Sequence, residues 1–154
     1  MKDAPETPLE LRARALRLLA RREHSREELR RKLASRVEAA EMLNAVLDSL
    51  ESKKQLSDER FSSERAHILS RKYGAARIRQ DLKARGIGAE LVAAVSAEGD
   101  TARAAAILAR KYRAPATTPK ERARRMRFLQ SRGFSHESIR KVLSSDADDD
   151  ALIP

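Results

Sequence analysis

The chain has 154 residues, a length that suits one domain or a short array of repeated units. Hydrophobic residues make up 41% of it and aromatic residues only 3%, so we expect a thin core of aliphatic side chains at helix contacts. The absence of cysteine excludes disulfides, thiol catalysis and thiolate metal sites. No apolar run reaches the roughly eighteen residues of a membrane-spanning helix, and no apolar signal segment is visible, so a cytoplasmic protein without a membrane segment is expected.

The net charge of +10 is concentrated in one part of the chain. Residues 1–50 carry +2 and residues 51–98 carry +3, whereas residues 99–145 carry +9. The last nine residues contain four aspartates and no base. The basic third part predicts an anionic partner, either nucleic acid or an acidic protein surface, while the charges of the first two parts are also explained by solubility alone.

Three helices are predicted in the first third of the chain. A capping box at Thr7, with proline at the first helical position, begins a helix that runs to about Arg22. A second capping box at Ser25 begins the next helix. A third helix follows from about Glu38 to Glu51, with apolar residues at helical spacing.

The middle third repeats this pattern. A helix capped by Ser57 or Asp58 is expected to run to Tyr73, with Ile68 on its apolar side. A second helix is predicted at residues 75–85, closed by a left-handed Gly86, and a third at residues 88–98.

The last third is the most basic. Asp100 is expected to cap an alanine-rich helix over residues 101–113. Thr118 repeats the entry signal of Thr7 and begins a helix rich in arginine, and Ser135 caps the final helix. Residues 146–154 are expected to form a loose acidic tail.

Self-comparison predicts a repeat architecture. Shifts of 49, 47 and 39 residues superpose, in turn, Leu33 on Leu82, Gly86 on Gly133, and Tyr73 on Tyr112. The difference between the last two shifts fits a longer loop around residues 113–118. Such periods indicate stacked units that cover each other's apolar faces, so we predict an all-α, elongated array of three tandem three-helix repeats. The predicted divisions are a disordered N-terminus at 1–8, repeats at 9–52, 57–98 and 100–145, and the acidic tail at 146–154.

Residues with the chemistry of an active site do not gather in this sequence. The three histidines are far apart, and His67 with Glu64 is most simply a solvated pair. Phosphate-binding glycine loops and nucleophile motifs are absent from the sequence. We therefore expect neither an enzyme nor a bound metal or cofactor.

Tyr73 and Tyr112 occupy equivalent places, each directly after Arg-Lys at the end of the first helix of a repeat. One interpretation is stacking on an unpaired base beside two cations, as in many single-strand binding proteins. The other is that each ring packs over the helix junction with its hydroxyl at the surface. The cations beside them also suit helix C-termini, where the dipole favours positive charge.

The strongest basic feature is the helix at residues 120–132, which we predict to contact an anion without reading sequence. The contact residues predicted from charge are Arg71, Lys72, Arg77, Lys83, Arg110, Lys111, Arg113, Arg122, Arg124, Arg125, Arg127 and Arg132, with Tyr73 and Tyr112 as candidates for stacking.

These motifs, in this order, resemble the RecX family of bacterial regulators of the RecA recombinase. The residues that carry the resemblance are Ser25, Glu28, Leu29, Lys32, Leu33, Ser57-Asp58-Glu59-Arg60-Phe61, Lys72-Tyr73-Gly74, Ile78, Leu82, Arg85-Gly86-Ile87, Leu129 and Arg132-Gly133-Phe134. One departure is that the family often has glycine in the turn before Leu56, where this chain has Lys54-Gln55. That difference concerns the geometry of this turn alone.

The resemblance implies a curved, right-handed array that inhibits RecA. Such proteins are thought to lie in the groove of the RecA filament on single-stranded DNA, where they suppress ATP hydrolysis, strand exchange and filament growth. The implied partners are the RecA filament and single-stranded DNA, with double-stranded DNA as a further option, and the implied state is a monomer without catalytic residues or cofactors. A helical repeat protein that binds nucleic acid without RecA is the alternative, and a scaffold for an acidic protein is a third hypothesis.

Overall fold

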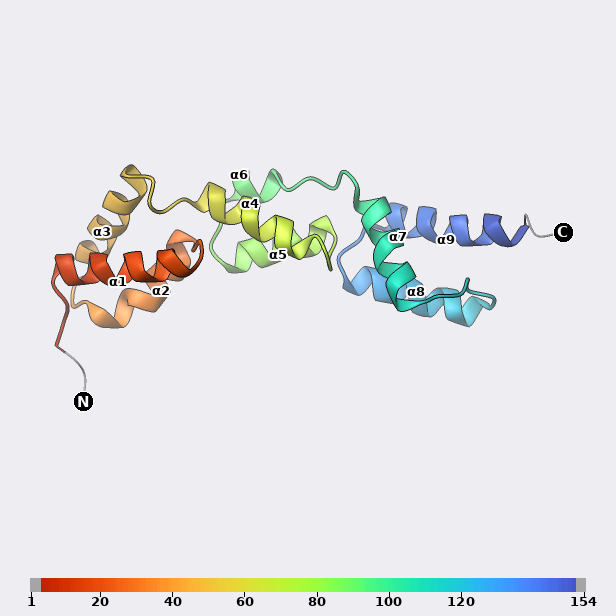
Figure 1. Cartoon of the computed structure of the whole chain (residues 1–154), viewed down its shortest axis with the longest axis horizontal. Helices are drawn as coiled ribbons and strands as arrows, with labels where there is room; N and C mark the ends of the chain where they lie inside the picture. The colour runs from red at the N-terminus through yellow and green to blue at the C-terminus, as the bar shows by residue number, and fades with distance from the viewer. Residues whose placement is uncertain (1–3, 152–154) are drawn as a thin grey trace. The chain divides into compact units, whose positions relative to one another are not determined.

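The computed structural model describes residues 4–151, and it describes the side chains of residues 4–144. In this range the chain is helical and contains no strand, which confirms the all-α prediction (Figure 1). The elements are α1 (Pro8–Arg21), α2 (Arg26–Leu33), the 3₁₀-helix η1 (Ala34–Arg36), α3 (Ala40–Ser52), α4 (Asp58–Leu69), α5 (Ala75–Ala84), α6 (Ala89–Ala93), α7 (Asp100–Lys111), α8 (Pro119–Ser131) and α9 (His136–Ala151). They form three successive trios, as the repeat pattern predicts. None of the described helices has both the length and the apolarity needed to cross a membrane.

Two compact units make up the fold. The first contains residues up to Arg65 together with Leu82–Val92, and the second contains Ala66–Asp81 together with the residues from Ala93 onward. The division therefore passes through the central repeat, whose residues are shared between the units. Each terminal repeat packs with one part of the central repeat.

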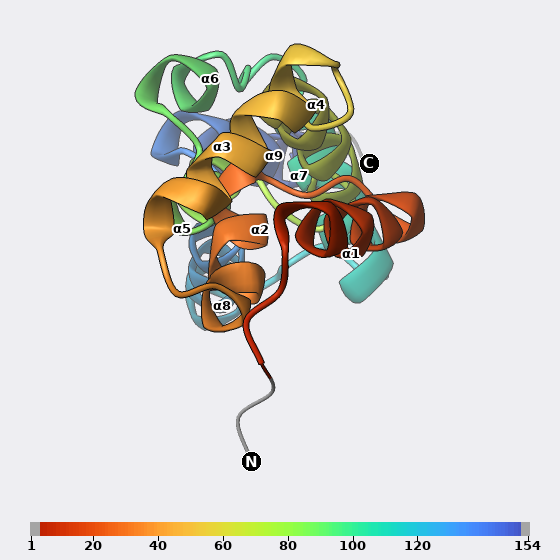
Figure 2. The ribbon, with the colours of Figure 1, turned by 90° about the vertical axis from the view of Figure 1, so that its left-hand side faces the viewer.

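The core of the first unit lies between α1, α2 and α3. Figure 2 shows α3 crossing above α2 and α1. Because α1 and α2 are amphipathic, Leu11, Leu29 and Leu33 are buried in the core while most of the arginines stay at the surface. The core consists of Leu11, Ala15, Leu29, Leu33, Leu43, Val46, Leu47, Leu50 and Leu56.

Both predicted capping boxes in the first repeat are at least partly formed. The backbone N–H of Glu28 donates to the Ser25 hydroxyl at 3.0 Å, and the Glu28 carboxylate accepts from the Ser25 N–H at 3.5 Å. The N–H of Glu10 donates to the Thr7 hydroxyl at 3.2 Å. Residues just before α1 are ordered rather than disordered, because the N–H of Glu6 donates to the Arg36 carbonyl at 2.9 Å. Residues 1–3 of the predicted disordered segment lie outside the described residues.

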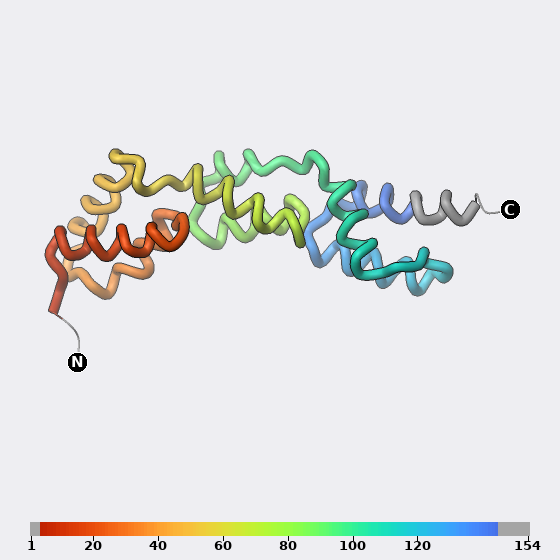
Figure 3. Tube along the Cα trace, viewed as in Figure 1, coloured from red at the N-terminus to blue at the C-terminus, as the bar shows by residue number. Residues whose placement is uncertain are grey.

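The core of the second unit lies between α7, α8 and α9. It consists of Ala104, Ile107, Leu108, Leu129, Phe134, Ile139 and Val142. Figure 3 traces the longer connection between α7 and α8, at the place where the repeat shifts predict a loop. Helix α9 continues to Ala151, so residues 146–151 are helical and the prediction of a loose tail was wrong for them. Residues 152–154 lie outside the described part of the chain.

Two helices of the central repeat are shorter than the sequence pattern predicts. Helix α4 ends at Leu69 because the N–H groups of Lys72 and Tyr73 both turn back to the Leu69 carbonyl. Helix α6 ends at Ala93, and the carbonyl of Val95 accepts a hydrogen bond from the Arg79 guanidinium at 2.5 Å instead of continuing the helix. Ile68, predicted to face the core, is 52% exposed.

Three helices end in the same left-handed turn. After α5 and α8, Gly86 and Gly133 have φ of +80° and +87°, and the residue after each donates its N–H to a carbonyl five positions back. After α3 the left-handed position is occupied by Lys54, with φ of +60°. Gln55 then donates to the Leu50 carbonyl at 2.9 Å. A glycine at position 54 would adopt this backbone conformation without the steric cost of a Cβ.

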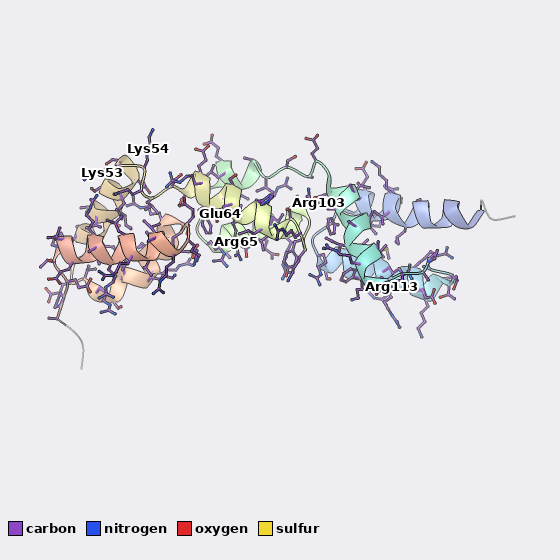
Figure 4. The ribbon with its side chains drawn as sticks, viewed as in Figure 1. Lys53, Lys54, Glu64, Arg65, Arg103 and Arg113 are labelled. Carbon is purple, nitrogen blue, oxygen red and sulfur yellow. The ribbon has the colours of Figure 1, made fainter. Side chains whose placement is uncertain are left out.

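Replacing Lys54 with glycine is expected to raise the free energy of unfolding by about 1 kcal/mol. The left-handed conformation costs a residue with a Cβ roughly this amount, and glycine is free of the cost. Lys54 is exposed and extends away from the turn, so little packing is lost (Figure 4). Urea denaturation followed by circular dichroism measures the change. The control is Lys53→Gly, at φ of −88°, which should not stabilise; equal stabilisation by both variants would contradict the explanation.

The two junctions between repeats are built alike. The Ser25 hydroxyl, at the start of α2, donates to the Arg85 carbonyl at 2.8 Å, and the Gly74 N–H, at the start of α5, donates to the Arg132 carbonyl at 2.8 Å. The glycine that follows each of these carbonyls is in close contact with the preceding repeat. A Cβ on Gly133 would lie 2.5 Å from the Arg77 backbone nitrogen. Only glycine fits this turn against the helix of the preceding repeat.

An aspartate at the start of one repeat caps a helix of the repeat before it. Asp58, the first residue of α4, accepts the N–H of Arg26 at the start of α2 at 2.8 Å. Asp100, the first residue of α7, accepts the N–H of Ala75 at the start of α5 at 3.2 Å. The prediction that Asp100 caps its own helix was therefore wrong, because Gly99 occupies that position and the Asp100 carboxylate is turned toward α5.

Candidate functional site

The cations predicted as contact residues lie in the second unit, with one exception. Lys83, near the end of α5, belongs to the first unit. The remaining residues come from the end of α4, the start of α5, the end of α7 and the length of α8. Within the second unit they divide into an inner set that contacts aromatic rings or carbonyls and an outer set without such contacts.

Four cations of the inner set alternate with three aromatic rings in a row, which we call the cation–aromatic ladder. Its members, in spatial order, are Arg77, Tyr73, Arg132, Phe128, Lys111, Tyr112 and Arg125. The Tyr73 ring has the Arg77 guanidinium at 5.3 Å and that of Arg132 at 5.4 Å. The Phe128 ring has Arg132 at 5.2 Å and the Lys111 ammonium at 4.1 Å. The Tyr112 ring has Lys111 at 5.7 Å and Arg125 at 4.5 Å.

Each ring of the ladder is half-buried and carries two cations, an arrangement that is favourable because a ring face is electron-rich. Tyr112 also meets Phe128 edge-on, with ring centroids 6.3 Å apart and planes at 81°. Both tyrosines therefore pack at helix junctions, as one of the two sequence interpretations has it.

The sequence analysis missed Phe128. It lies next to the core residue Leu129, and a search for hydrophobic periodicity does not distinguish it from other apolar residues of the helix. It could have been singled out because it is one of only five aromatic residues in the chain and lies in the most basic helix.

Three guanidinium groups are also anchored on backbone carbonyls near helix ends. Arg110 donates to the Arg71 carbonyl at 2.8 Å, beyond the end of α4. Arg125 donates to the Ala114 carbonyl at 2.8 Å, and Arg77 donates to the Ser131 carbonyl at 3.4 Å. The unpaired carbonyls of a helix C-terminus are partners that suit a cation.

Arg125 is buried, with 7% of its surface exposed, so its prediction as a surface contact was wrong. It occupies the position that the repeat shift of 47 assigns to Ile78 of the central repeat, which is also buried. The Tyr112 ring and the Ala114 carbonyl solvate its charge there, and burial without such partners would be costly.

The outer set is exposed and unpaired. Its members are Arg71, Lys72, Arg113, Arg122, Arg124 and Arg127, and none of them makes an ion pair with any residue that the structure describes. Arg113 lies beyond the end of α7 (Figure 4). These six side chains are exposed to solvent and available to an external anion.

Asp100, Glu121 and Glu137, in this part of the chain, are already engaged. Asp100 pairs with Arg103 and caps α5. Glu121 accepts the Thr117 N–H at 2.8 Å, and this hydrogen bond holds the pKa of its carboxyl below the usual value. Glu137 pairs with Lys141 at 3.2 Å. The positive charge of α8 is therefore not neutralised internally within the described residues.

In the first unit, by contrast, several arginines are paired with acids. Arg22 contacts Glu28 at 2.6 Å, and Arg26 contacts Asp48 at 2.7 Å. Burial alone would raise the pKa of Glu28, but the Arg22 hydrogen bond and the nearby arginine charges hold it below its usual value. The first unit thus presents mixed charge, whereas the surface around α8 is positive.

The buried histidine, His24, is held by two hydrogen bonds. His24 is buried, its Nδ1 donates to the Arg22 carbonyl at 3.0 Å, and its Nε2 accepts from the Lys32 ammonium at 2.9 Å. Burial lowers the pKa of His24, which keeps the ring neutral. No group of three potential metal-binding side chains is found among the described residues.

Comparison with known families gives three consecutive matches. Residues 12–50, 57–95 and 98–143 match the family models of the first, second and third three-helix domains of RecX. A Regulatory protein RecX of Herbaspirillum seropedicae is 44% identical over 151 residues, covering 94% of this chain and 98% of that protein. Another, of Ralstonia nicotianae, is 41% identical and covers 90% of this chain and 89% of its own length.

Solved structures agree on the fold. A crystal structure of RecX from Lactobacillus salivarius superposes with a TM-score of 0.79 at 15% identity, covering 91% of this chain and 96% of that one. A second crystal structure, of a regulatory protein RecX, gives a TM-score of 0.74 at 20% identity, covering 88% and 72%. At these identities the likeness concerns the arrangement of helices.

Proposed function

Because the chain belongs to the RecX family of regulatory proteins, we propose that it is a negative regulator of RecA that binds the RecA filament on single-stranded DNA. The proposed effects are inhibition of ATP hydrolysis, of strand exchange and of filament growth. The chain acts as a cytoplasmic monomer without a cofactor, and it has no catalytic role.

The observation that carries this proposal is the uncompensated positive charge of the second unit. The six cations of the outer set have no acidic partner among the described residues, and Asp100, Glu121 and Glu137 are engaged with other groups. A nucleoprotein filament contains a dense row of phosphates, and a positively charged surface is attracted to it at long range. Binding in the groove of the filament brings this surface close to the DNA backbone.

The proposal is tested by the DNA-dependent ATPase of RecA. Adding this protein at substoichiometric amounts to RecA on single-stranded DNA is expected to lower the steady-state rate, because one bound molecule acts on several protomers of a filament. An ATPase rate unchanged at equimolar protein would contradict the proposal.

The alternative is a nucleic-acid-binding protein that acts without RecA, and the charge of the second unit alone would favour it. The two functions predict different relative affinities for RecA filaments and for naked single strands. A RecA regulator binds filaments more tightly than naked single strands at the same salt concentration, because protein contacts add to the phosphate contacts. Equal affinity for both would favour the alternative.

A further inference from the structure

We propose that the cation–aromatic ladder makes the second unit a reader of the polyanionic backbone and not of bases, with Phe128 as the residue that positions its cations. The ligand class is therefore any extended phosphate polymer, with or without bases. The inference rests on the proposed anionic contact and deepens it, because it assigns separate roles to the rings and to the cations.

The first argument is the occupancy of the rings. A base that stacks on an aromatic side chain needs an accessible ring face. Tyr73, Phe128 and Tyr112 are half-buried, and each already has two cations within 5.7 Å of its centroid. Stacking a base would have to displace guanidinium or ammonium groups from these rings.

The second argument is the connectivity of the ladder. Lys111 lies over both Phe128 and Tyr112, and Arg132 lies over both Phe128 and Tyr73. Phe128 is the ring that joins these two cations. It therefore sets the spacing between the positive charge at the end of α7 and that at the end of α8. Such preorganisation lowers the ordering cost when the cations meet a row of phosphates.

The third argument is the division of labour between the two sets of cations. Arg125 and Arg77 are anchored on carbonyls inside the unit, and they hold the outer rings of the ladder. The outer set has no such anchors and extends into solvent. Lys111 and Arg132 combine features of both sets, because each contacts two aromatic rings but makes no ion pair with a described residue. They are the ladder members best placed to meet phosphate oxygens.

The test compares three polymers of equal charge: a deoxythymidine strand, an abasic strand of the same length and inorganic polyphosphate. The full chain, without RecA, is titrated with each polymer over a range of salt concentrations. We expect the affinities for the thymidine and abasic strands to agree within threefold. A weaker affinity for the abasic strand by more than threefold would overturn the inference, because loss of even one stacked base costs about fivefold or more.

Two variants test Phe128 as a positioning residue. Phe128→Leu keeps an apolar side chain but removes the ring, and it is expected to weaken binding of all three polymers about threefold to tenfold. If both cations lose their phosphate contacts, the slope of log affinity against log salt should fall in magnitude by about 1.4 on single strands. Phe128→Tyr keeps the ring and should restore both quantities. The positioning role would be overturned if Phe128→Leu kept the wild-type salt slope. It would also be overturned if the salt slope of Phe128→Tyr differed from that of the wild type.

The outcomes separate this inference from the proposed function. If RecA is inhibited but the abasic strand binds poorly, the reading of the ladder is wrong and the regulator proposal stands. If all three polymers bind equally but RecA is unaffected, the ladder inference stands and the regulator proposal fails. If Phe128→Leu does not fold, the inference is still tested by comparing the thymidine and abasic strands and by the salt slope of Phe128→Tyr.

Discussion

Charge reversal of Arg122, Arg124 and Arg127 to glutamate is expected to lower the affinity for single-stranded DNA on the order of 50-fold at about 0.15 M salt. These arginines are exposed on α8 and have no ion pair with any described residue, so they are available to phosphates. On single strands each neutralised phosphate contributes about 0.7 to the slope of log affinity against log salt, so the slope should fall in magnitude by about 2. Inhibition of the RecA ATPase should require correspondingly more protein.

The matched control reverses three exposed cations of the first unit, namely Arg17, Arg21 and Lys53. It changes the net charge by the same amount but leaves the surface around α8 intact. We expect a loss of at most about threefold from this control, as is usual for charges away from the contact. Equal losses from the two triple variants would show that net charge alone governs binding and would remove α8 from the contact. Arg125 is left unchanged because it is buried and its reversal would disturb the fold.

Replacement of Gly133 with alanine is expected to lower the free energy of unfolding by about 3 kcal/mol. The residue has φ of +87°, which costs an L-residue with a side chain roughly 1–2 kcal/mol. The new Cβ would also meet the Arg77 backbone nitrogen at 2.5 Å, and overpacking of this kind costs about 1–3 kcal/mol more. Chemical denaturation measures the sum.

Two further glycines separate these contributions. Gly99 has φ of +79° but would place its Cβ no closer than 3.4 Å to the Arg103 guanidinium, so Gly99→Ala should cost only the backbone strain. Gly88 has neither a left-handed backbone nor a neighbour within 4 Å of an added Cβ. Gly88→Ala should change stability by less than about 0.5 kcal/mol. An order of costs other than Gly133, Gly99, Gly88 would contradict this account of the repeat junction.

Much of the fold is predictable from sequence because local signals and the repeat agree. The capping box at Ser25 and the left-handed Gly86 mark helix ends through their own hydrogen bonds and backbone geometry. Helix α6 and the role of Asp100 were not predictable in this way. The residues after α6 bind the Arg79 guanidinium, and the Asp100 carboxylate binds the first turn of α5. These partners are distant in sequence and become neighbours only after folding.

The candidate site is predictable in its charge but not in its geometry. Counting cations identifies the third repeat, and the tyrosines at equivalent positions are correctly singled out as neighbours of cations. Charge alone predicts that Arg125 is a surface contact, but it is buried. Hydrophobicity alone predicts that Phe128 is an ordinary apolar residue, but it lies in the cation–aromatic ladder.

The aspartate caps at Asp58 and Asp100 make the folding of neighbouring repeats interdependent. A chain cut at the boundary of one family domain would keep the helix but lose the carboxylate that satisfies its first N–H groups, at a cost of roughly 1 kcal/mol for each missing cap. Nearest-neighbour coupling of this kind makes the unfolding of adjacent repeats cooperative. Isolated single domains of this protein are therefore poor substitutes for the whole chain in any binding assay.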